Sequence, residues 1–332
     1  MPSRLPLVQA PMAGGPSTPE LAGAVSEAGG FGFVAGAYLS AEALRQALDR
    51  TRTLTSAPIG VNLFVPGPRH VDDEAIARYA EELRPEADRF GVALGDPRWE
   101  DDAFDAKVDV LASAGVHLVT FTFGVPPAEV VARLQRADAL VGVTVTSATE
   151  ADRAAAAGAE VLVVQGAEAG GHQGVLDPAK PNSTPLLTAL GEIRRLGLPM
   201  IGAGGIMSAA DVRAVLDAGA VAAQVGTALL CTPEAATSGV HRQALLDGRY
   251  ADTVVTRAFS GRWARGLANR FALEHPDAPG GYPQVHHLTR PLRTAAVAAG
   301  DAGVPNLWAG TGWREVRAEP AADVVRRLTT GL

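Results

Sequence analysis

Short apolar runs separated by amphipathic stretches recur along the first two thirds of the chain. Within each run nearly every position is apolar, which is typical of a strand that is buried on both faces of a parallel sheet. The pattern predicts eight such strands. They are Leu5–Ala10, Phe31–Ala35, Pro58–Phe64, Val116–Phe121, Leu140–Val145, Glu160–Gln165, Met200–Ala203 and Val221–Val225.

The segments between these runs have the apolar period of helices. Ser17, followed three residues later by Glu20, predicts a capping box at the start of the first helix. Several of the predicted helices stop at a glycine, as at Gly158 and Gly219. The helical stretches are Pro19–Ala28, Ala41–Thr51, Ala75–Arg89, Phe104–Ala114, Pro127–Ala137, Ala148–Ala157, Thr184–Leu196 and Ala209–Ala218.

Eight strands that alternate with helices indicate an α/β protein of the TIM (β/α)8 barrel type, with a doubly wound open sheet as the alternative. After Thr232 the pattern changes to mixed polar helices and a Pro- and Gly-rich stretch. We therefore expect residues 1–232 to form the barrel and 233–310 a second, smaller and mainly helical lobe. Residues 311–332 are expected to form a tail that packs back on the barrel.

Charge and composition exclude some classes of binding partner and indicate a cellular compartment. The 29 basic and 36 acidic residues leave a net charge of −7, and no basic stripe interleaved with aromatic residues suggests nucleic acid. No apolar run has the ~18 residues needed to span a membrane. Cys231 is the only cysteine, so no internal disulfide can form. With no recognisable signal peptide at the N-terminus, we expect a cytoplasmic protein.

Glycine-rich loops follow the last two predicted strands, in Ile201–Ile206 and Gln224–Ala228. Glycine lets a backbone approach a phosphate closely, and backbone N–H groups at a helix start can bind it. In TIM barrels the phosphate site is frequently built from the loops after strands seven and eight. The two loops together indicate a phosphate site, although each alone is also compatible with a simple tight turn.

Two earlier strand ends suit a flat ring system. The segment Gln9–Leu21 offers small residues that a planar ring could approach, and Gly60–Pro66 places Asn62 at the top of the barrel. An amide there can pair with the carbonyl and N–H groups of an isoalloxazine, but it can equally be a satisfied core amide.

The sixth strand ends in QGAEAGGHQG, from Gln165 to Gly174. His172 is bracketed by glycines at the catalytic end of a barrel strand, and histidine is well suited to proton transfer near neutral pH. We therefore expect His172 to be catalytic, against the alternative of an ordinary surface histidine. No metal site is expected, because the adjacent His286 and His287 rarely face one ion together and lack a third ligand at useful spacing.

Several blocks of the chain resemble those of bacterial nitronate monooxygenases, formerly called 2-nitropropane dioxygenases. The blocks are QAPMAGGPSTPEL, GVNLFVP, TFTFGVP (Thr120–Pro126), QGAEAGGHQG, IGAGGI and QVGTA. RAFSGRWARG (Arg257–Gly266) and LWAGTGW (Leu307–Trp313) are similar to the end of that family. The resemblance implies FMN as cofactor, with contacts at Met12, Ala13, Asn62, Gln165, Gly170, Gly171, Gly204, Gly205, Gln224, Gly226 and Thr227.

The same resemblance implies oxidation of an alkyl nitronate by O2 to a carbonyl compound and nitrite, without pyridine nucleotide. His172 would anchor the nitro group or take its α-proton. Gln173 stands where the family's block usually has an arginine, which could weaken attraction for an anionic substrate. Homodimer formation is compatible with this interpretation.

Three alternatives remain at this stage. A flavin enoyl-acyl-carrier-protein reductase shares the AGGH block and would consume NAD(P)H. A family member recruited to oxidise a specialised metabolite would share both cofactor and fold. A flavin-binding module without turnover would lack a catalytic use for His172.

Overall fold

The computed structural model describes residues 2–332. Its main sheet contains eight parallel strands in the order β1-β9-β8-β6-β5-β4-β3-β2. β1 and β2, at the two ends of this ladder, meet through the bridge between Val8 and Phe31, so the sheet nearly closes into a TIM-like barrel. The strands are β1 (Leu7–Gln9), β2 (Phe33–Ala35), β3 (Gly60–Phe64), β4 (Leu118–Thr122), β5 (Leu140–Val145), β6 (Val161–Gln165), β8 (Met200–Ala203) and β9 (Ala222–Val225).

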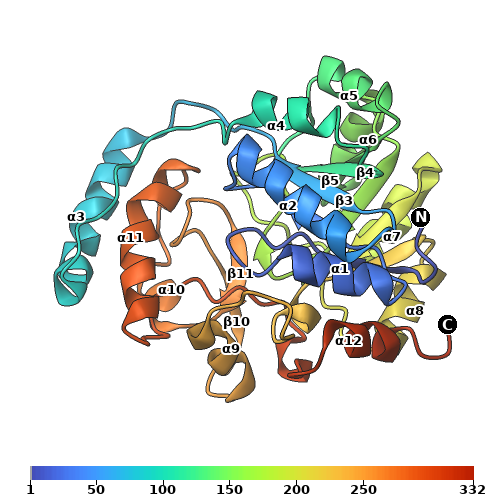
Figure 1. Ribbon diagram of the computed structural model, residues 1–332. Coiled ribbons are helices and arrows are strands. Elements are labelled where there is room, and N and C mark those ends of the chain that lie inside the picture. Colours follow the sequence, from blue (N-terminus) through green and yellow to red (C-terminus); the bar gives the residue numbers. More distant parts are fainter. Residues whose placement is uncertain (1) are drawn as a thin grey trace.

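The eight predicted strands are therefore confirmed, and the open-sheet alternative is wrong. Helices surround the barrel (Figure 1) and pack their apolar faces on the outer faces of the strands. They are α1 (Pro19–Glu27), α2 (Ala41–Leu54), α4 (Phe104–Leu111), α5 (Ala128–Gln135), α6 (Ala148–Ala156), α7 (Leu186–Ile193), α8 (Ala209–Asp217) and α12 (Ala321–Leu328). No helix among residues 2–332 is long and apolar enough to cross a membrane.

The predicted capping box at Ser17 is wrong. The N-cap of α1 is Thr18, whose hydroxyl accepts from the backbone N–H of Leu21 at 2.9 Å. Ser17 accepts instead from the backbone N–H of Met12 at 2.8 Å and from the side chain of Gln9 at 3.1 Å. Its hydroxyl therefore shapes the loop after β1, one residue before the helix begins.

The remaining chain adds a small antiparallel sheet and further helices. β10 (Thr253–Thr256) pairs with β11 (Ala264–Leu267), and β11 pairs with β7 (Gly171–His172) from the loop after β6. This part also contains α9 (Gly239–Leu246), α10 (Arg270–Glu274) and α11 (Gln284–Ala298). The predicted division of the chain at residues 232 and 310, and a separate helical lobe, stay predictions.

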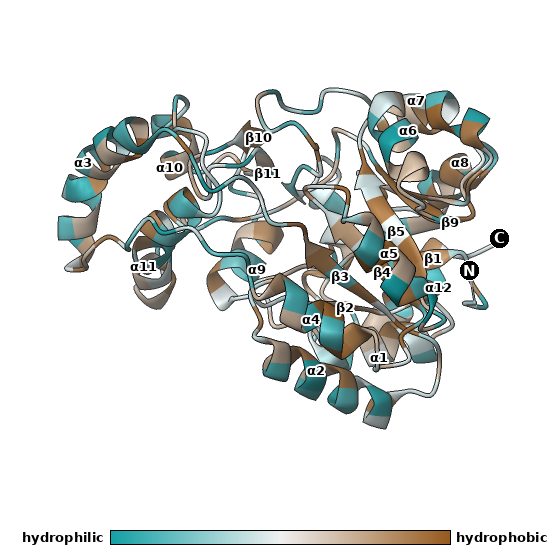
Figure 2. Cartoon of the chain, turned by 90° about the horizontal axis from the view of Figure 1, so that it is seen from above, coloured by the Kyte–Doolittle hydropathy of each residue, from teal (hydrophilic) through white to brown (hydrophobic). Residues whose placement is uncertain are grey.

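A separate apolar cluster joins α3 (Asp73–Phe90) to α10 and α11. The two long helices lie side by side at one side of the molecule, as Figures 1 and 2 both show. Although α3 lies between β3 and β4 in the chain, its apolar face therefore packs on residues almost 200 positions further along.

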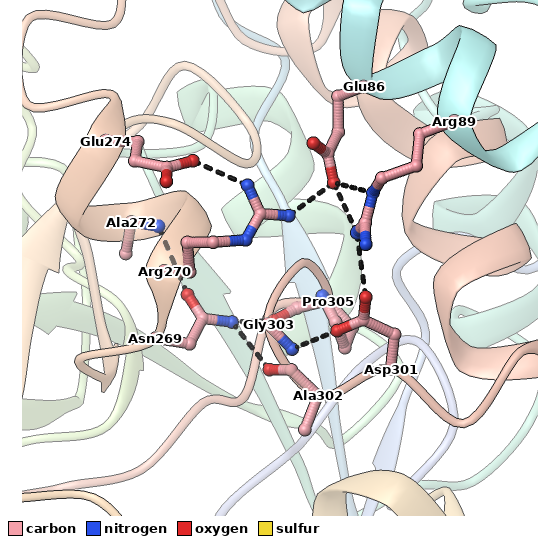
Figure 3. A network of polar contacts seen from close by, with 10 residues as sticks. All are labelled: Glu86, Arg89, Asn269, Arg270, Ala272, Glu274, Asp301, Ala302, Gly303 and Pro305. Carbon is pink, nitrogen blue, oxygen red and sulfur yellow. Dashed lines mark hydrogen bonds and ion pairs between the residues drawn. The ribbon is translucent and has the colours of Figure 1, made fainter.

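An ion network fastens α3 to the chain after α11 (Figure 3). Glu86 of α3 pairs with Arg270 and with Arg89, and Arg89 pairs with Asp301 at 2.7 Å. Asn269 donates from its side chain to the carbonyls of Ala302 (3.1 Å) and Pro305 (2.8 Å). These bonds hold the segment 301–305, which leads directly into residues 306–308 of the cavity described below.

Glycine is required where α1 packs on the start of β2. A Cβ on Gly32 would lie 2.2 Å from the carbonyl oxygen of Ala22, and backbone cannot yield there without moving the helix. We expect Gly32→Ala to lower the free energy of unfolding by at least ~2 kcal/mol, as overpacked cores do. Chemical denaturation of purified protein measures the change.

The matched control is Gly191→Ala in α7, where an added Cβ meets nothing within 4 Å. It should leave stability unchanged or raise it by up to ~1 kcal/mol, because alanine favours a helix over glycine. Equal effects of the two substitutions would contradict the packing argument.

Candidate active site

A cavity of about 550 Å³ opens at the carboxyl ends of the barrel strands. This size lies within the usual range for small-molecule and cofactor sites. All twelve residues predicted for the site line this cavity, although they come from five of the eight barrel strands or the loops after them. They are Met12, Ala13, Asn62, Gln165, Gly170, Gly171, His172, Gly204, Gly205, Gln224, Gly226 and Thr227.

One end of the cavity is made of glycine backbone. Gly204 and Gly205, after β8, have φ values of 129° and 70°, which side-chain-bearing residues rarely adopt. Among residues 2–332, the backbone N–H groups of Gly205, Gly226 and Thr227 have no acceptor within the protein. Exposed N–H groups of this kind form a concave site for an anion.

The helices next to these loops differ in detail from the prediction. After Gly205 the chain enters α8 through a capping box, in which Ser208 and Asp211 bond each other's backbone N–H groups. After Gly226 comes only a three-residue 3-10 helix, Thr227–Leu229, where the sequence suggested a full helix. The anion-binding groups are therefore loop amides, with the Thr227 hydroxyl beside them.

A short apolar segment after β1 lines the wall next to the glycines. Met12 and Ala13 follow β1, and the Met12 sulfur lies near Gly226, where an added Cβ would be 3.5 Å from it. The bond from the Met12 N–H to Ser17 holds this loop open toward the cavity. Such a wall leaves room for the face of a planar ring.

Asn62 lies on β3 and is almost fully buried. Its amide nitrogen donates to the hydroxyls of Thr120 (3.0 Å) and Thr122 (3.1 Å) and to the carbonyl of Thr120 (3.1 Å). Its nitrogen is therefore satisfied inside the barrel, and its side-chain oxygen is the atom left to accept a hydrogen bond from a ligand.

Gln165 uses its side chain within the protein. Its amide nitrogen donates to the carbonyl of His172 at 3.1 Å, and its amide oxygen accepts from the N–H of Gly174 at 2.7 Å. Gln165 therefore fixes both sides of the loop that carries the histidine, while its aliphatic part still lines the cavity.

His172 is held by neighbours from three parts of the chain. Its backbone pairs with Ala264 in the small sheet. Its Nε2 lies 2.7 Å from the hydroxyl of Ser260. The rings of Phe123 and Trp308 have centroids 5.5 and 5.4 Å from the imidazole. The imidazole is thus fixed in orientation inside an apolar surround.

The charged side chains that line the cavity are basic. No aspartate or glutamate of residues 2–332 lines it, whereas Arg290 and Arg293 do, and Arg262 lies close by. Arg262 is 5% exposed and bonds the carbonyl of Val175 instead of a carboxylate. Arg293 bonds only Thr289, His286 and Asn306. Among residues 2–332 neither guanidinium forms an ion pair with an acidic side chain, and Glu150 acts on Arg262 only through space.

These charges and burial keep the histidines neutral. Desolvation lowers the pKa of His172 to about 3, helped by the nearby charges of Arg262 and Arg293. The pKa of His286 is lowered for the same reasons. Burial also lowers the pKa of His241 to about 4, although its bond to the Trp308 carbonyl opposes the shift. At neutral pH the positive charge of the cavity therefore resides on arginines.

Gln173 does not face the cavity. It is 1% exposed, and its side chain exchanges two hydrogen bonds with the backbone of Asn182, at 2.8 and 2.9 Å. The expected weakening of the site by a neutral residue at this position therefore has no structural basis. The positive charge comes from Arg262 and Arg293, which lie on other segments.

Several residues of the site were not predicted to belong to it from the sequence. Tyr38, after β2, has its ring stacked on His286 with centroids 4.6 Å apart. Phe64 lines the same cavity, and the Tyr282 ring lies 5.9 Å from the His172 ring. Tyr38 and Tyr282 had no periodic or motif signal, whereas Phe64 ended the predicted strand Pro58–Phe64 and lay in the block GVNLFVP. Ser260, Arg262 and Trp308 lay inside the blocks RAFSGRWARG and LWAGTGW, which offered the only usable hint.

His286 and His287 have different partners, because adjacent residues in a helix point in different directions. His286 lines the cavity, and His287 lies 3.1 Å from Glu100 on the other side. His241 also lines the cavity, and its ring Nε2 lies 3.0 Å from the Trp308 carbonyl oxygen.

The cavity residues fit a flavin nucleotide. One end offers unpaired amides for a phosphate, and the apolar segment at Met12 and Ala13 borders the cavity beside them. Asn62, also a lining residue, supplies a buried side-chain oxygen as a hydrogen-bond acceptor. The loop after β6 packs closely on the backbone near Gly310. This packing needs glycine at position 170, since a Cβ there would lie 2.4 Å from the backbone nitrogen of Gly310.

Comparisons with known proteins show the family to which the chain belongs. The family model for nitronate monooxygenase matches residues 3–331. A nitronate monooxygenase of Pseudomonas aeruginosa is 38% identical, over 98% of this chain and 96% of its own length. The crystal structure of a nitroalkane oxidase from Streptomyces ansochromogenes is 48% identical, with a TM-score of 0.96 over 98% of this chain and 95% of that one.

The reductase-like structures are more distant. FabK from Thermotoga maritima is 26% identical, with a TM-score of 0.77 over 98% of this chain and 92% of that one. The matched length and the identity leave one assignment. The chain belongs to the nitronate monooxygenase family, a family of flavin-dependent monooxygenases.

Proposed function

We propose that the protein binds FMN and oxidises an alkyl nitronate, such as propionate 3-nitronate, with O2 to a carbonyl compound and nitrite. The observation that carries this proposal is the charge of the cavity. It has a glycine-lined anion site at one end, arginines at the other and no acidic side chain among its lining residues. A cofactor phosphate and an anionic substrate both suit such a cavity.

Each part of the chain has a separate task in this proposal. The loop amides of Gly205, Gly226 and Thr227 bind the phosphate, and Met12 and Ala13 cover one face of the ring. Asn62 accepts a hydrogen bond from the ring edge, and Gln165 holds the loop of His172 in place. Bound FMN supplies the redox chemistry, in which the substrate is oxidised and O2 is reduced.

His172 faces the substrate as a neutral imidazole. A histidine with a pKa of about 3 is a weak base, so it is poorly suited to taking a proton from a neutral nitroalkane. A nitronate has already lost that proton and needs only hydrogen bonds and positive potential. Its negative charge would also raise the pKa of His172 and strengthen the bond between them. These arguments favour anchoring over base catalysis.

The first prediction concerns the cofactor. The purified protein should be yellow and release FMN, not FAD, on denaturation. In Gly205→Ala the new Cβ would lie 3.0 Å from the Glu168 Cβ in a strained left-handed backbone, so we expect flavin content to fall at least tenfold. Absorbance near the flavin bands and mass spectrometry of the released cofactor measure this.

Gly197→Ala is the matched control, because Gly197 has nearly the same φ, 67°, with nothing within 4 Å and no place in the cavity. It should keep its flavin. A wild-type protein that stays colourless after incubation with FMN would overturn the cofactor proposal.

The second prediction concerns the substrate. Preformed propionate 3-nitronate should drive O2 uptake without NAD(P)H, with kcat/KM at least tenfold higher than for the parent nitro compound, because arginines attract the anion. An oxygen electrode follows the reaction, and nitrite is assayed as product. Fast NADPH oxidation without nitronate turnover would favour the reductase alternative, and equal rates for both forms would favour His172 as a base.

The third prediction concerns His172 and pH. His172→Ala should keep FMN but lose at least ~100-fold in kcat/KM, the scale expected when a positioned polar group is removed from the reacting centre.

Because the pKa of His172 is depressed to about 3, its neutral form persists as pH falls from 8 to 5. The wild-type pH profile of kcat/KM should therefore show no acid limb near the ordinary pKa of histidine, about 6.5.

The control for this substitution is His275→Ala, at a histidine outside the cavity that pairs with Glu82. Its turnover should equal that of the wild type. Unchanged turnover in His172→Ala would remove His172 from the mechanism, and an acid limb at pH 6.5 that disappears in His172→Ala would show an ordinary titrating base.

A further inference from the structure

Tyr38 adopts a backbone conformation that is costly for a residue with a side chain. It follows β2 with a φ of 65°, in the left-handed region. Such a residue persists only where its surroundings hold it, and strained positions of this kind gather at functional sites. Asp102 and Ala103 are also left-handed, with φ values of 57° and 51°, and Asp102 is in direct contact with Tyr38.

A buried ion pair holds this conformation. The backbone N–H of Tyr38 donates to both carboxylate oxygens of Asp102, at 3.0 and 3.3 Å. The ammonium group of Lys107, on α4, lies 2.7 Å from the same carboxylate, and the Lys107 side chain is 1% exposed. Lys107 is one of only two lysines in the chain. Burial raises the pKa of Asp102, and the Lys107 ammonium opposes that shift and so favours the charged carboxylate.

The side chain of Tyr38 borders the substrate half of the cavity. Its ring stacks on His286 of α11 and lies edge-on to Phe64, with centroids 5.8 Å apart. The hydroxyl of Tyr282 donates to its oxygen at 3.2 Å. Tyr38 therefore connects the loop after β2 with two residues that lie more than 240 positions further along the chain.

The hydroxyl hydrogen of Tyr38 is available to a ligand. Its oxygen already accepts from Tyr282, and no residue among 2–332 accepts its O–H. Burial raises the pKa of Tyr38 to about 12, so the group remains a donor at neutral pH. A nitronate offers two oxygen atoms as acceptors for such a donor.

We propose that Asp102, fixed by Lys107, is a positioning residue that holds Tyr38 so that its phenol O–H donates to an oxygen of the anionic substrate. This inference rests on the proposed function for the identity of the substrate. The contact between Asp102 and the Tyr38 backbone stands independently of it. Asp102 itself touches neither cofactor nor substrate, and acts through Tyr38.

The test compares two double variants that differ only in the acceptor for the Tyr38 N–H. Both replace Lys107 by Met, so that no unpaired charge is left buried. In Asp102→Ala/Lys107→Met the acceptor is absent, and in Asp102→Asn/Lys107→Met an amide oxygen replaces it. We expect the alanine form to raise KM for propionate 3-nitronate about tenfold with kcat within twofold of wild type. The asparagine form should recover most of that loss.

A second readout needs no turnover. In the alanine form the Tyr38 amide should exchange its hydrogen at least tenfold faster, measured by mass spectrometry on the FMN-loaded protein, and the asparagine form should restore protection. Tyr38→Phe should raise KM by a similar factor without changing amide exchange at that position. Asp105→Asn, at an exposed carboxylate on α4, the helix of Lys107, is the surface control and should change neither quantity.

The outcomes separate cleanly. Unchanged exchange and unchanged KM in the alanine form would overturn the inference. A parallel fall in flavin content and kcat together with a rise in KM would also overturn it. That result would show that Asp102 supports the fold of the whole site and does not position Tyr38 specifically. If the wild type oxidises no nitronate, the proposed function fails, whereas amide exchange still decides whether Asp102 holds Tyr38.

Discussion

Backbone contact between the loop after β6 and the chain near Gly310 is the constraint on which the site depends. Gly170 packs so closely on Ala309 and Gly310 that a single Cβ would overlap backbone atoms. The N–H of Thr311 donates to the Glu168 carbonyl at 3.0 Å, and the N–H of Gly310 donates to the Thr227 hydroxyl at 3.0 Å. These contacts bring three distant segments together at the catalytic end of the barrel, and the cavity is the space that they enclose.

The second constraint is electrostatic. Burying a guanidinium without a carboxylate is costly, and here backbone carbonyls and neutral side chains offset only part of that cost. The result is a positive potential in a cavity whose lining, in the described part of the chain, includes no acidic side chain. It also explains the neutral histidines, because imidazolium would be repelled by Arg262 and Arg293 as well as desolvated. A cavity of this kind prefers anions before any specific contact is made.

The barrel and the glycine loops could be predicted from the sequence because both depend on local signals. Continuous apolar runs specify strands buried on both faces, and glycines at strand ends mark close backbone approach. The orientation of polar side chains could not be predicted in this way. Gln173 turns inward to Asn182, Gln165 binds its own loop, and the N-cap of α1 is Thr18, not Ser17. Each choice depends on a partner that only the folded chain supplies.

This difference divides the cavity into two halves with different origins. The half that we propose for a phosphate is built from backbone, so its requirement for glycine is visible in the sequence wherever the fold is known. The half that we propose for the substrate depends on side chains that are distant in sequence: Tyr38 follows β2, Tyr282 precedes α11 and His286 lies in α11. The packing of α11 on α3, and the ion network of Figure 3, fix this second half. Substitutions there can change the substrate while the flavin site stays intact, so the cofactor follows more directly from the family than the substrate does.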